Sequence, residues 1–335
     1  MKVVIPVAGI GSRLKPHTFT TPKPLMEVGG KTIIERVLED VKKLNPEEVV
    51  FVVNYKRNLI EEYISKKYPS LKCSFVEQPV RDGDGAAVLC ALDKLEEDDD
   101  LYVIFGADTL IDFDIKKAIL KNKLVDALIF VREVDNPQHY GVVNHDSKLK
   151  IYEVEEKPEN PKSNSAIIGA YYFKSLLRLK GYLKHFKENK ITEKGEYKVI
   201  QAIKKYIEDN DSLVKAHKVD EWFDCGRPEI MLESNKYFLS KTSKTKKAVA
   251  MGNSLIIPPC FIDKSAKINN SVVGPYTSVG AGVELDNVTI KNSIIGSDTK
   301  INNIILANSL IGKEVVLKHK LKQINMGDRS EIIFE

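Results

Sequence analysis

Between residues 262 and 317, apolar residues recur about every six positions, and this period constrains the fold more than any other feature of the chain. A glycine follows four of these positions. A hexapeptide period predicts a parallel β-helix, with three short faces per coil and the apolar side chains stacked inside. Some spacings are five, so we expect imperfect coils; the alternative is a run of β-hairpins, which favour a period of two. The apolar positions are Ile262, Ile268, Val273, Val279, Leu285, Ile290, Ile295, Ile301, Ile311 and Leu317.

The chain before this repeat alternates between strand-like and helix-like segments. Short β-branched runs predict strands at 2–8, 48–55, 74–78 and 101–108, and helical apolar periods predict helices at 32–44, 58–68, 86–95 and 114–122. Strand–helix alternation indicates a mostly parallel sheet covered on both faces. The polar, basic stretch SKTSKTKK at 240–247 is typical of a linker. We therefore expect one domain over 1–240, a linker over 241–250 and a second domain with its tail over 251–335.

Ligands of parallel sheets bind at the carboxyl ends of the strands, so the loops at 8–14, 78–85 and 106–110 should lie on one edge. The first loop belongs to the stretch PVAGIGSRLKPHTFTTPKPL, in which glycines and basic residues favour phosphate binding. The dinucleotide motif G-x-G-x-x-G fails at Leu14, and the P-loop motif fails at Leu25. A tight turn would explain the glycines, but not Arg13, Lys15 and Lys23 beside them.

Composition narrows the class of protein further. The 335 residues carry a net charge of only +4, and the basic residues are spread along the chain, which argues against a nucleic-acid partner. No apolar run approaches the roughly 18 residues that span a bilayer, and the N-terminal apolar run is too short for a signal peptide. We expect a cytoplasmic protein with no membrane partner. The four cysteines are scattered without a C-x-x-C pair, so they indicate neither a disulfide framework nor a zinc site.

The pattern G-x-G-[ST]-R-L-x-P-x-T-x-x-x-P-K-P-L over residues 9–25 resembles the signature of sugar-1-phosphate nucleotidylyltransferases, also called NDP-sugar pyrophosphorylases. The resemblance covers nearly the whole chain and is closest to glucose-1-phosphate thymidylyltransferases with a hexapeptide-repeat tail. It implies a mostly parallel, Rossmann-like α/β sheet followed by a left-handed parallel β-helix. Further matching segments are QPVRDGDGAA (78–87), FGADTL (105–110), HYGVV (139–143), EEKP (155–158), AIIGAYYF (166–173), KGEY (194–197) and EWFDCGRPE (221–229).

The same resemblance implies a role for each matching site residue. Arg13 would grip the nucleotide phosphates, Lys23 would face the attacked phosphate, and Lys157 would face the sugar phosphate. The remaining nucleotide contacts would be Gly9, Ile10, Gly11 and Ser12 with the phosphates, and Gln78 and Gly83 with the base. The sugar-phosphate pocket would comprise Gly141, Glu156, Lys157 and Gly169.

A magnesium ion is implied as well, and its hard oxygen ligands would be Asp108 and Asp224. Asp112 and Asp114 form a rival D-x-D pattern, which glycosyltransferases use to hold metal. For Asp114 we favour a different interpretation, in which it caps the helix that begins at Ile115. Asp84 departs from many relatives, which carry a small or apolar residue there. Its carboxylate either alters the choice of nucleotide or caps the helix at 85–95.

The implied reaction joins a nucleoside triphosphate and a sugar 1-phosphate into an NDP-sugar and pyrophosphate. The resemblance favours dTTP or UTP with glucose 1-phosphate, and it implies a homo-oligomer. The alternatives are a mannose-1-phosphate guanylyltransferase, a non-catalytic relative that senses nucleotide sugars, and a glycosyltransferase built on the D-x-D pattern. A sensing relative should have lost site residues, whereas Arg13, Lys23, Asp108, Lys157 and Asp224 are all present.

Overall fold

The computed structural model describes residues 1–95, 98–106, 109–209, 211–242 and 247–319. The chain divides into two compact units. The first comprises Met1–Glu27 and Lys31–Met231, and the second comprises Val28–Gly30 and Leu232–Glu335.

The first unit is built on a nine-stranded sheet in the order β10-β9-β11-β6-β1-β4-β5, with β8 beside β11 and β12 beside β8. The first four strands of this sheet along the chain are parallel to one another, as the strand–helix alternation predicts. Strand β11 runs antiparallel to β6, β8 and β9, so the sheet as a whole is mixed. The strands are β1 (Lys2–Pro6), β4 (Glu48–Val53), β5 (Cys73–Glu77), β6 (Leu101–Ile104), β8 (Ala127–Glu133), β9 (Gly141–His145), β10 (Ile151–Glu156), β11 (Ser165–Phe173) and β12 (Val214–Lys218).

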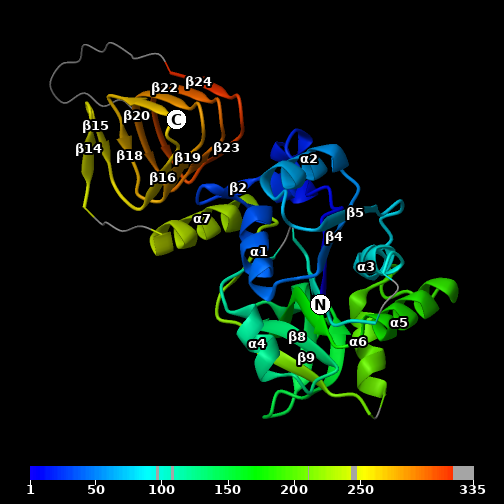
Figure 1. The fold of residues 1–335 in the computed structure, drawn as a ribbon. Coiled ribbons are helices and arrows are strands. Elements are labelled where there is room, and N and C mark those ends of the chain that lie inside the picture. Colours follow the sequence, from blue (N-terminus) through cyan, green and yellow to red (C-terminus); the bar gives the residue numbers. More distant parts are fainter. Residues whose placement is uncertain (96–97, 107–108, 210, 243–246, 320–335) are drawn as a thin grey trace. The chain divides into compact units, whose positions relative to one another are not determined.

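Helices pack on this sheet because its central strands are apolar on both faces. All five residues of β1 are buried. Helices α3, α5 and α6 contact one another and share a core with the sheet, and Figure 1 shows them grouped on one side of it. The helices of this unit are α1 (Ile33–Val41), α2 (Arg57–Lys67), α3 (Asp84–Leu92), α4 (Ile115–Lys121), α5 (Leu176–Glu188) and α6 (Val199–Glu208), and α7 (Pro228–Thr242) continues into the second unit.

The eight elements predicted up to residue 122 are all present, and their boundaries differ by a few residues. The strand predicted at 101–108 ends at Ile104. Helix α1 begins where Thr32 caps the amide of Glu35 and Glu35 in turn accepts from the amide of Thr32, a reciprocal capping box. Helix α3 begins at Asp84, earlier than predicted, because Gly83 lies at its N-cap.

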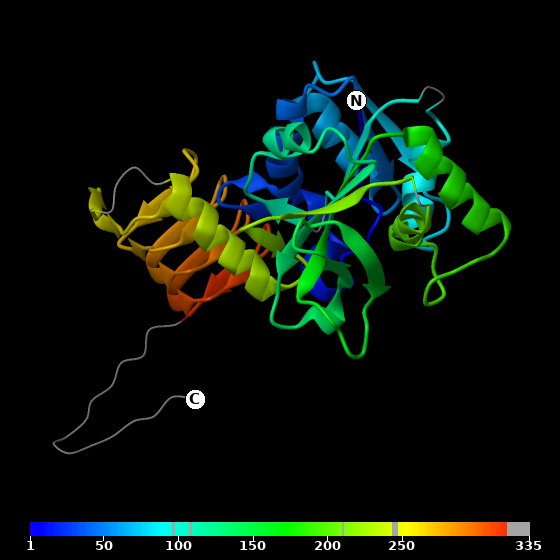
Figure 2. The same ribbon diagram turned by 90° about the horizontal axis from the view of Figure 1, so that it is seen from below.

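The second unit stacks short strands on top of one another. Strands pair in parallel with strands 16 or 17 residues further along, as in Leu255↔Val272 and Ile294↔Leu310. The strands form a seven-stranded sheet and a four-stranded sheet, and Figure 2 shows their stacking from below. The strands are β14 (Val249–Met251), β15 (Ser254–Ile256), β16 (Cys260–Ile262), β17 (Lys267–Asn269), β18 (Val272–Val273), β19 (Thr277–Val279), β20 (Glu284–Lys291), β21 (Ile294–Ile295), β22 (Lys300–Ala307), β23 (Leu310–Ile311) and β24 (Val316–Lys318).

The ten apolar positions of the six-residue period all belong to the core of this second unit. Seven are buried, and Ile262, Ile311 and Leu317 are partly buried against the same cluster. Apart from β14 with β15, the strand pairs found between residues 249 and 318 are parallel. The hairpin alternative is therefore wrong, because hairpins pair neighbouring strands in antiparallel fashion.

Asparagines occupy equivalent positions in successive layers of these stacked strands, either inside β20 and β22 or next to strand ends. Asn287 and Asn303 have φ angles of 55° and 56°, in the left-handed region that asparagine tolerates better than most residues. The Nδ2 of Asn287 donates to Oδ1 of Asn303 at 2.8 Å, and Asn292 donates in the same way to Asn308 at 2.7 Å. Each bond joins equivalent positions of successive layers, so the asparagines help to fix the register.

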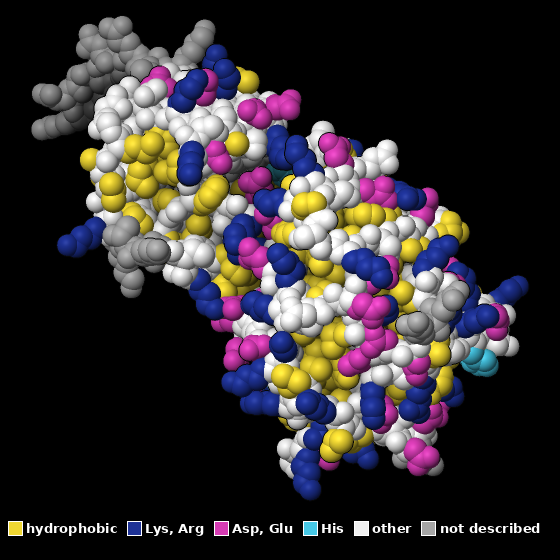
Figure 3. Space-filling view, viewed as in Figure 1, with side chains coloured by type: hydrophobic (Ala, Val, Ile, Leu, Met, Phe, Trp, Pro, Cys, Tyr) yellow, Lys and Arg dark blue, Asp and Glu magenta, His cyan; other side chains and the backbone are white. Residues whose placement is uncertain are grey.

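The surface of the first unit carries both signs of charge. On the face seen in Figure 3, Lys and Arg side chains are interspersed with Asp and Glu. Among the helices that the structure describes, none is both long enough and apolar enough to cross a membrane.

Candidate nucleotide-binding site

The first unit contains a cavity of about 370 Å³ at the carboxyl ends of β1, β5 and β6. Residues that follow each of these strands contribute to its wall. After β6 the contributing residue is Phe105, which comes just before the predicted loop at 106–110; residues 107 and 108 of that loop lie outside the described residues. Its volume lies within the range of small-molecule sites. The lining residues are Pro6, Val7, Ala8, Gly9, Gly11, Ser12, Arg13, Lys23, Gln78, Arg81, Gly83, Asp84, Ala87, Phe105, Glu196 and Gly226.

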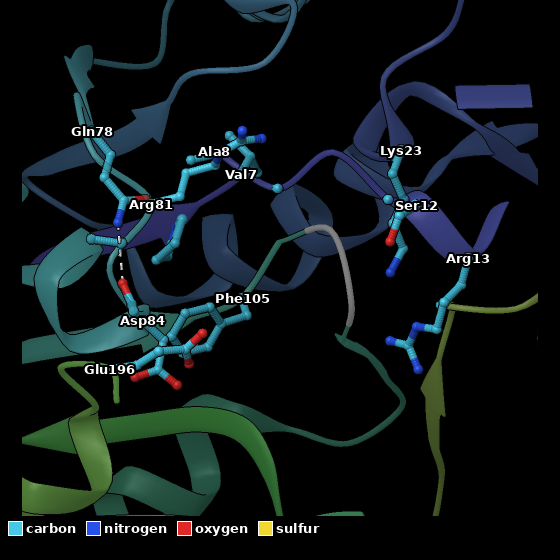
Figure 4. Close-up of a pocket in the computed structure, with 16 residues that line it drawn as sticks. Val7, Ala8, Ser12, Arg13, Lys23, Gln78, Arg81, Asp84, Phe105 and Glu196 are labelled. Carbon is cyan, nitrogen blue, oxygen red and sulfur yellow. Dashed lines mark hydrogen bonds between the residues drawn. The ribbon is translucent and has the colours of Figure 1, made fainter. Parts of the chain in front are cut away.

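One end of the cavity is basic. Ser12 and Arg13 belong to the short 3-10 helix η1 (Ser12–Leu14), and both are exposed. Lys23 lines the same end although only 3% of it is exposed. Gly11 precedes η1 with a φ of 70°, and a Cβ there would lie 3.0 Å from Thr18 and 3.2 Å from Lys23. Glycine therefore lets this turn pack against the segment that carries Lys23. Figure 4 shows Ser12, Arg13 and Lys23 together.

Arg13 lies close to Asp224, although 211 positions separate them in the sequence. A Cβ placed on Gly226 would lie 2.6 Å from Nη2 of Arg13 and 3.0 Å from Oδ1 of Asp224. Asp224 ends strand β13 (Trp222–Asp224), which pairs with β7 (Thr109–Ile111), and Asp224 pairs with Thr109. Asp108, the other predicted metal ligand, lies outside the described residues.

The carboxylate of Asp224 is a hard oxygen donor, so it fits a divalent cation such as Mg²⁺. Within the described residues, no group of three or more His, Cys, Asp or Glu side chains could hold a metal ion.

The other end of the cavity carries amide and carboxylate groups. Gln78 is buried, and its Nε2 donates to the carbonyl oxygen of Gly83 at 3.1 Å. Asp84 and Glu196 lie near this bond in Figure 4, and Arg81 is exposed beside them. Burial raises the pKa of Asp84 to about 6, although hydrogen bonding to the Val199 amide and the charge of Lys198 oppose the shift.

The predicted sugar-phosphate residues do not line this cavity. Gly141 and Glu156 pair across β9 and β10. The Oε1 of Glu156 lies 2.9 Å from Nζ of Lys198 and 3.8 Å from Nζ of Lys157. Gly169 lies next to the cavity: its carbonyl oxygen accepts a hydrogen bond at 3.0 Å from the amide of Phe105, which lines the cavity. Ile10 is the predicted nucleotide residue that does not line the cavity.

Nine lining residues were not predicted as site residues. Pro6, Val7 and Ala8 come just before the glycine-containing signature at 9–25. The other six are Arg81, Asp84, Ala87, Phe105, Glu196 and Gly226. Each of these six lies inside a segment that matches the family, so the motifs marked the regions without identifying these side chains. Asp84 does not cap its own helix through its side chain. Its Oδ1 accepts from the amide of Val199 at 2.8 Å, at the start of α6.

The D-x-D pattern has a structural explanation. Asp114 is the N-cap of α4, and its side chain accepts from the amide of Lys117 at 2.9 Å, so the capping interpretation is confirmed. The backbone amide of Asp112 donates to the carbonyl of Glu221 at 3.3 Å. Neither aspartate lines the cavity.

Comparison with known proteins identifies the family. The sequence profile of the nucleotidyl transferase family matches residues 2–241, so the chain belongs to this family. Enzymes of this family generally use a divalent metal. Their substrates are nucleoside triphosphates and sugar 1-phosphates.

The chain is also similar to individual relatives and to solved structures of nucleotidyltransferases. The chain is 37% identical over 79% of its length to the bifunctional protein GlmU of Methanocaldococcus jannaschii, and it spans 61% of that relative. It is 28% identical over 73% of its length to the UTP–glucose-1-phosphate uridylyltransferase AglF of Haloferax volcanii, of which it spans 99%. A candidate glucose-1-phosphate thymidylyltransferase from Bacillus anthracis superposes with a TM-score of 0.63 at 25% identity, over 74% of this chain and 98% of the other.

Proposed function

We propose that the protein is a sugar-1-phosphate nucleotidylyltransferase that acts on dTTP or UTP and glucose 1-phosphate. The observation that carries this proposal is the two-ended cavity. Its basic end comprises the glycine turn, Arg13 and Lys23, and its other end comprises Gln78 and Gly83. The two ends suit the two parts of a nucleotide, the triphosphate and the base.

In the proposed reaction, an oxygen of the sugar phosphate attacks the α-phosphorus of the nucleotide in line. A new P–O bond forms, the bond from the α-phosphorus to the β-phosphate oxygen breaks, and pyrophosphate leaves. The attacking phosphate is already largely dianionic at neutral pH, so little general-base help is needed. The chain's task is to align two polyanions and to neutralise the charge that develops.

The residues of the basic end suit that task. Arg13 can present paired N–H donors to phosphate oxygens, and Lys23 supplies a point charge. The buried position of Lys23 strengthens its electrostatic effect, because water screens it less. On the sugar side, Lys157 would bind the sugar phosphate, and Glu156, held by Lys198, would accept from sugar hydroxyls with Gly141 and Gly169 beside it.

We further propose that Asp108 and Asp224 hold Mg²⁺, which would offset charge on the phosphates. Asp224→Asn should then raise the Mg²⁺ concentration for half-maximal rate at least about tenfold, because one of two charged ligands is lost. Magnesium titrations of the initial rate measure this. Asp114→Asn is the matched control and should change the value less than about twofold, since asparagine also caps helices well. A larger effect from Asp114→Asn would restore the D-x-D hypothesis.

Nucleotide and sugar preference can be tested directly by pyrophosphate release. A panel would cross five nucleoside triphosphates with glucose, galactose, mannose and N-acetylglucosamine 1-phosphates. We expect dTTP or UTP with glucose 1-phosphate to give the highest kcat/KM. The support is the resemblance of the 78–87 segment and the uridylyltransferase and thymidylyltransferase among the similar proteins. A tenfold advantage for GTP with mannose 1-phosphate would replace the substrates but leave the reaction class intact.

For the C-terminal part, we propose a second domain with its tail over 251–335, which follows a catalytic domain over 1–240 and a linker over 241–250. Within this second domain, we propose that the described strands between residues 251 and 318 form a left-handed parallel β-helix. The support is the parallel pairing every 16 or 17 residues and the shared core of the apolar positions. We also propose that the protein is a homo-oligomer, as the family resemblance implies. Light scattering measures the mass of the assembly.

A further inference from the structure

Two segments 115 positions apart, residues 82–85 and 197–199, are joined by three hydrogen bonds. The amide of Tyr197 donates to the carbonyl of Asp82 at 2.8 Å, and the amide of Gly85 donates to the carbonyl of Tyr197 at 2.9 Å. The third bond is the one from the Val199 amide to Oδ1 of Asp84, at 2.8 Å. We call these three bonds the 84–199 clasp. Two of them are between backbones, and the third depends on one side chain.

The two segments of the clasp touch without side chains between them. A Cβ on Gly83 would lie 2.1 Å from the carbonyl oxygen of Tyr197, and a Cβ on Gly85 would lie 2.7 Å from the carbonyl carbon of Lys198. The wall of the cavity that carries Gly83 therefore rests directly on the residues that begin α6. A shift of either segment would move the other.

The chemistry of Asp84 suits a holding role. Val199 is the first residue of α6, and its amide is one of the donors that a helix leaves without an intrahelical partner. A carboxylate at this position satisfies that donor and interacts favourably with the helix dipole. Hydrogen bonds to an ionised acceptor are stronger than those to a neutral one, so protonation of Asp84 should weaken the clasp.

Several charged or titratable groups surround Asp84. Lys198 favours the ionised carboxylate, whereas Glu156 on β10 opposes it. Tyr171 on β11 senses the charge of Asp84, and burial keeps the pKa of its hydroxyl well above the usual value. Glu196 lines the same cavity. Burial is the largest influence and raises the pKa of Asp84 to about 6, which brings its titration close to neutral pH.

We propose that Asp84 is a positioning residue for the nucleotide: by accepting the Val199 amide proton, its carboxylate holds residues 82–85 in the shape that the bound base requires. The effect reaches the base end because Gln78 bonds to the carbonyl of Gly83, inside the clasped segment. Asp84 therefore sets nucleotide affinity and leaves the chemical step unchanged. This inference rests on the proposed function, since it assigns the base to this end of the cavity.

The kinetic test compares Asp84→Ala and Asp84→Asn with the wild type. At pH 8, Asp84→Ala should raise KM for the nucleotide roughly fivefold to twentyfold, with kcat and the KM for the sugar phosphate changed less than twofold. Asp84→Asn keeps a hydrogen-bond acceptor but loses the negative charge, so its KM for the nucleotide should lie between those of the wild type and Asp84→Ala. Asp93→Ala removes an exposed carboxylate at the other end of α3 and is the matched control; it should leave every constant within twofold.

A pH series separates this role from a merely structural one. As the pH falls from 8 to 5, wild-type Asp84 becomes protonated, so the ratio of KM for Asp84→Asn to KM for the wild type should fall toward one. Ionisation of the nucleotide affects both proteins equally and cancels in this ratio. A ratio that stays constant across the series, or an Asp84→Ala variant whose nucleotide KM is within twofold of wild type, would overturn the inference.

Two measurements on the unreacted protein keep this inference distinct from the proposed function. Asp84→Ala should accelerate hydrogen exchange of the Val199 amide at least tenfold and weaken binding of UTP, measured by calorimetry, in proportion to the change in KM. Unchanged exchange or unchanged UTP affinity overturns the inference. A wild-type protein that turns over no pair of the substrate panel contradicts the proposed function instead, while exchange and UTP binding still decide the role of Asp84.

Discussion

Arg13→Ala should lower kcat/KM by roughly tenfold to a hundredfold or more and leave the protein folded. A hydrogen bond to a charged group contributes about 1.5–3 kcal/mol, and each 1.4 kcal/mol corresponds to a factor of about ten in rate. Arg13 is exposed on η1 and lines the cavity, so its removal leaves no gap in the core. The measurements are pyrophosphate release under subsaturating substrate and the thermal unfolding midpoint, which should stay close to that of the wild type.

Lys15→Ala is the matched control for this prediction. Lys15 lies two residues further on, is also exposed, and carries the same charge, but its Nζ lies over the Phe19 ring at 5.2 Å and it does not line the cavity. Its loss should change kcat/KM by less than about twofold. If the two variants lose activity equally, net charge near the loop matters more than the position of Arg13, and the proposed phosphate contact is wrong.

Features encoded by neighbouring residues could be predicted from the sequence. The six-residue period identifies the core positions of the second unit, because each apolar residue of the repeat points into the same core as the one before it. The cap at Asp114 is equally local, since an N-cap bonds to an amide three residues away. The meeting of the loops after β1, β5 and β6 follows from a general rule for parallel strands.

Features that depend on distant residues could not be predicted in the same way. Strand β11 is antiparallel to its neighbours, and no local pattern distinguishes it from a parallel strand. The partner of Asp84 is Val199, so its role depends on how α6 is placed against α3. Arg13 and Gly226 likewise meet through the fold. The family motifs located these regions, while the contacts within them required the structure.

Gly83→Ala should both destabilise the protein and impair nucleotide binding. Gly83 has a φ of 128°, where a residue with a side chain is strained, and its added Cβ would lie 2.1 Å from the backbone oxygen of Tyr197. Backbone strain of this kind costs about 1–3 kcal/mol, and the clash must move either the base end of the cavity or the start of α6. We expect the free energy of unfolding to fall by at least about 2 kcal/mol. We also expect the KM for the nucleotide to rise tenfold or more, because a tenfold change in KM corresponds to only about 1.4 kcal/mol. Urea unfolding and steady-state kinetics measure the two effects.

Gly181→Ala is the matched control for Gly83→Ala, because it makes the same chemical change at a position where we expect no loss of stability. Gly181 is exposed within α5, and apart from the backbone of its own helix no heavy atom lies within 4 Å of the point that an added Cβ would occupy. Alanine is a better helix former than glycine by about 0.5–1 kcal/mol, so this variant should be slightly more stable than the wild type, with unchanged kinetics. Comparison of the two variants separates the effect of the close contact between residue 83 and Tyr197 from the general effect of adding a methyl group. If Gly83→Ala instead unfolds at the wild-type urea concentration and keeps the wild-type nucleotide KM, the prediction is wrong. Residues 82–85 would then move without loss of stability or nucleotide affinity, and their contact with α6 would not determine the shape of the site.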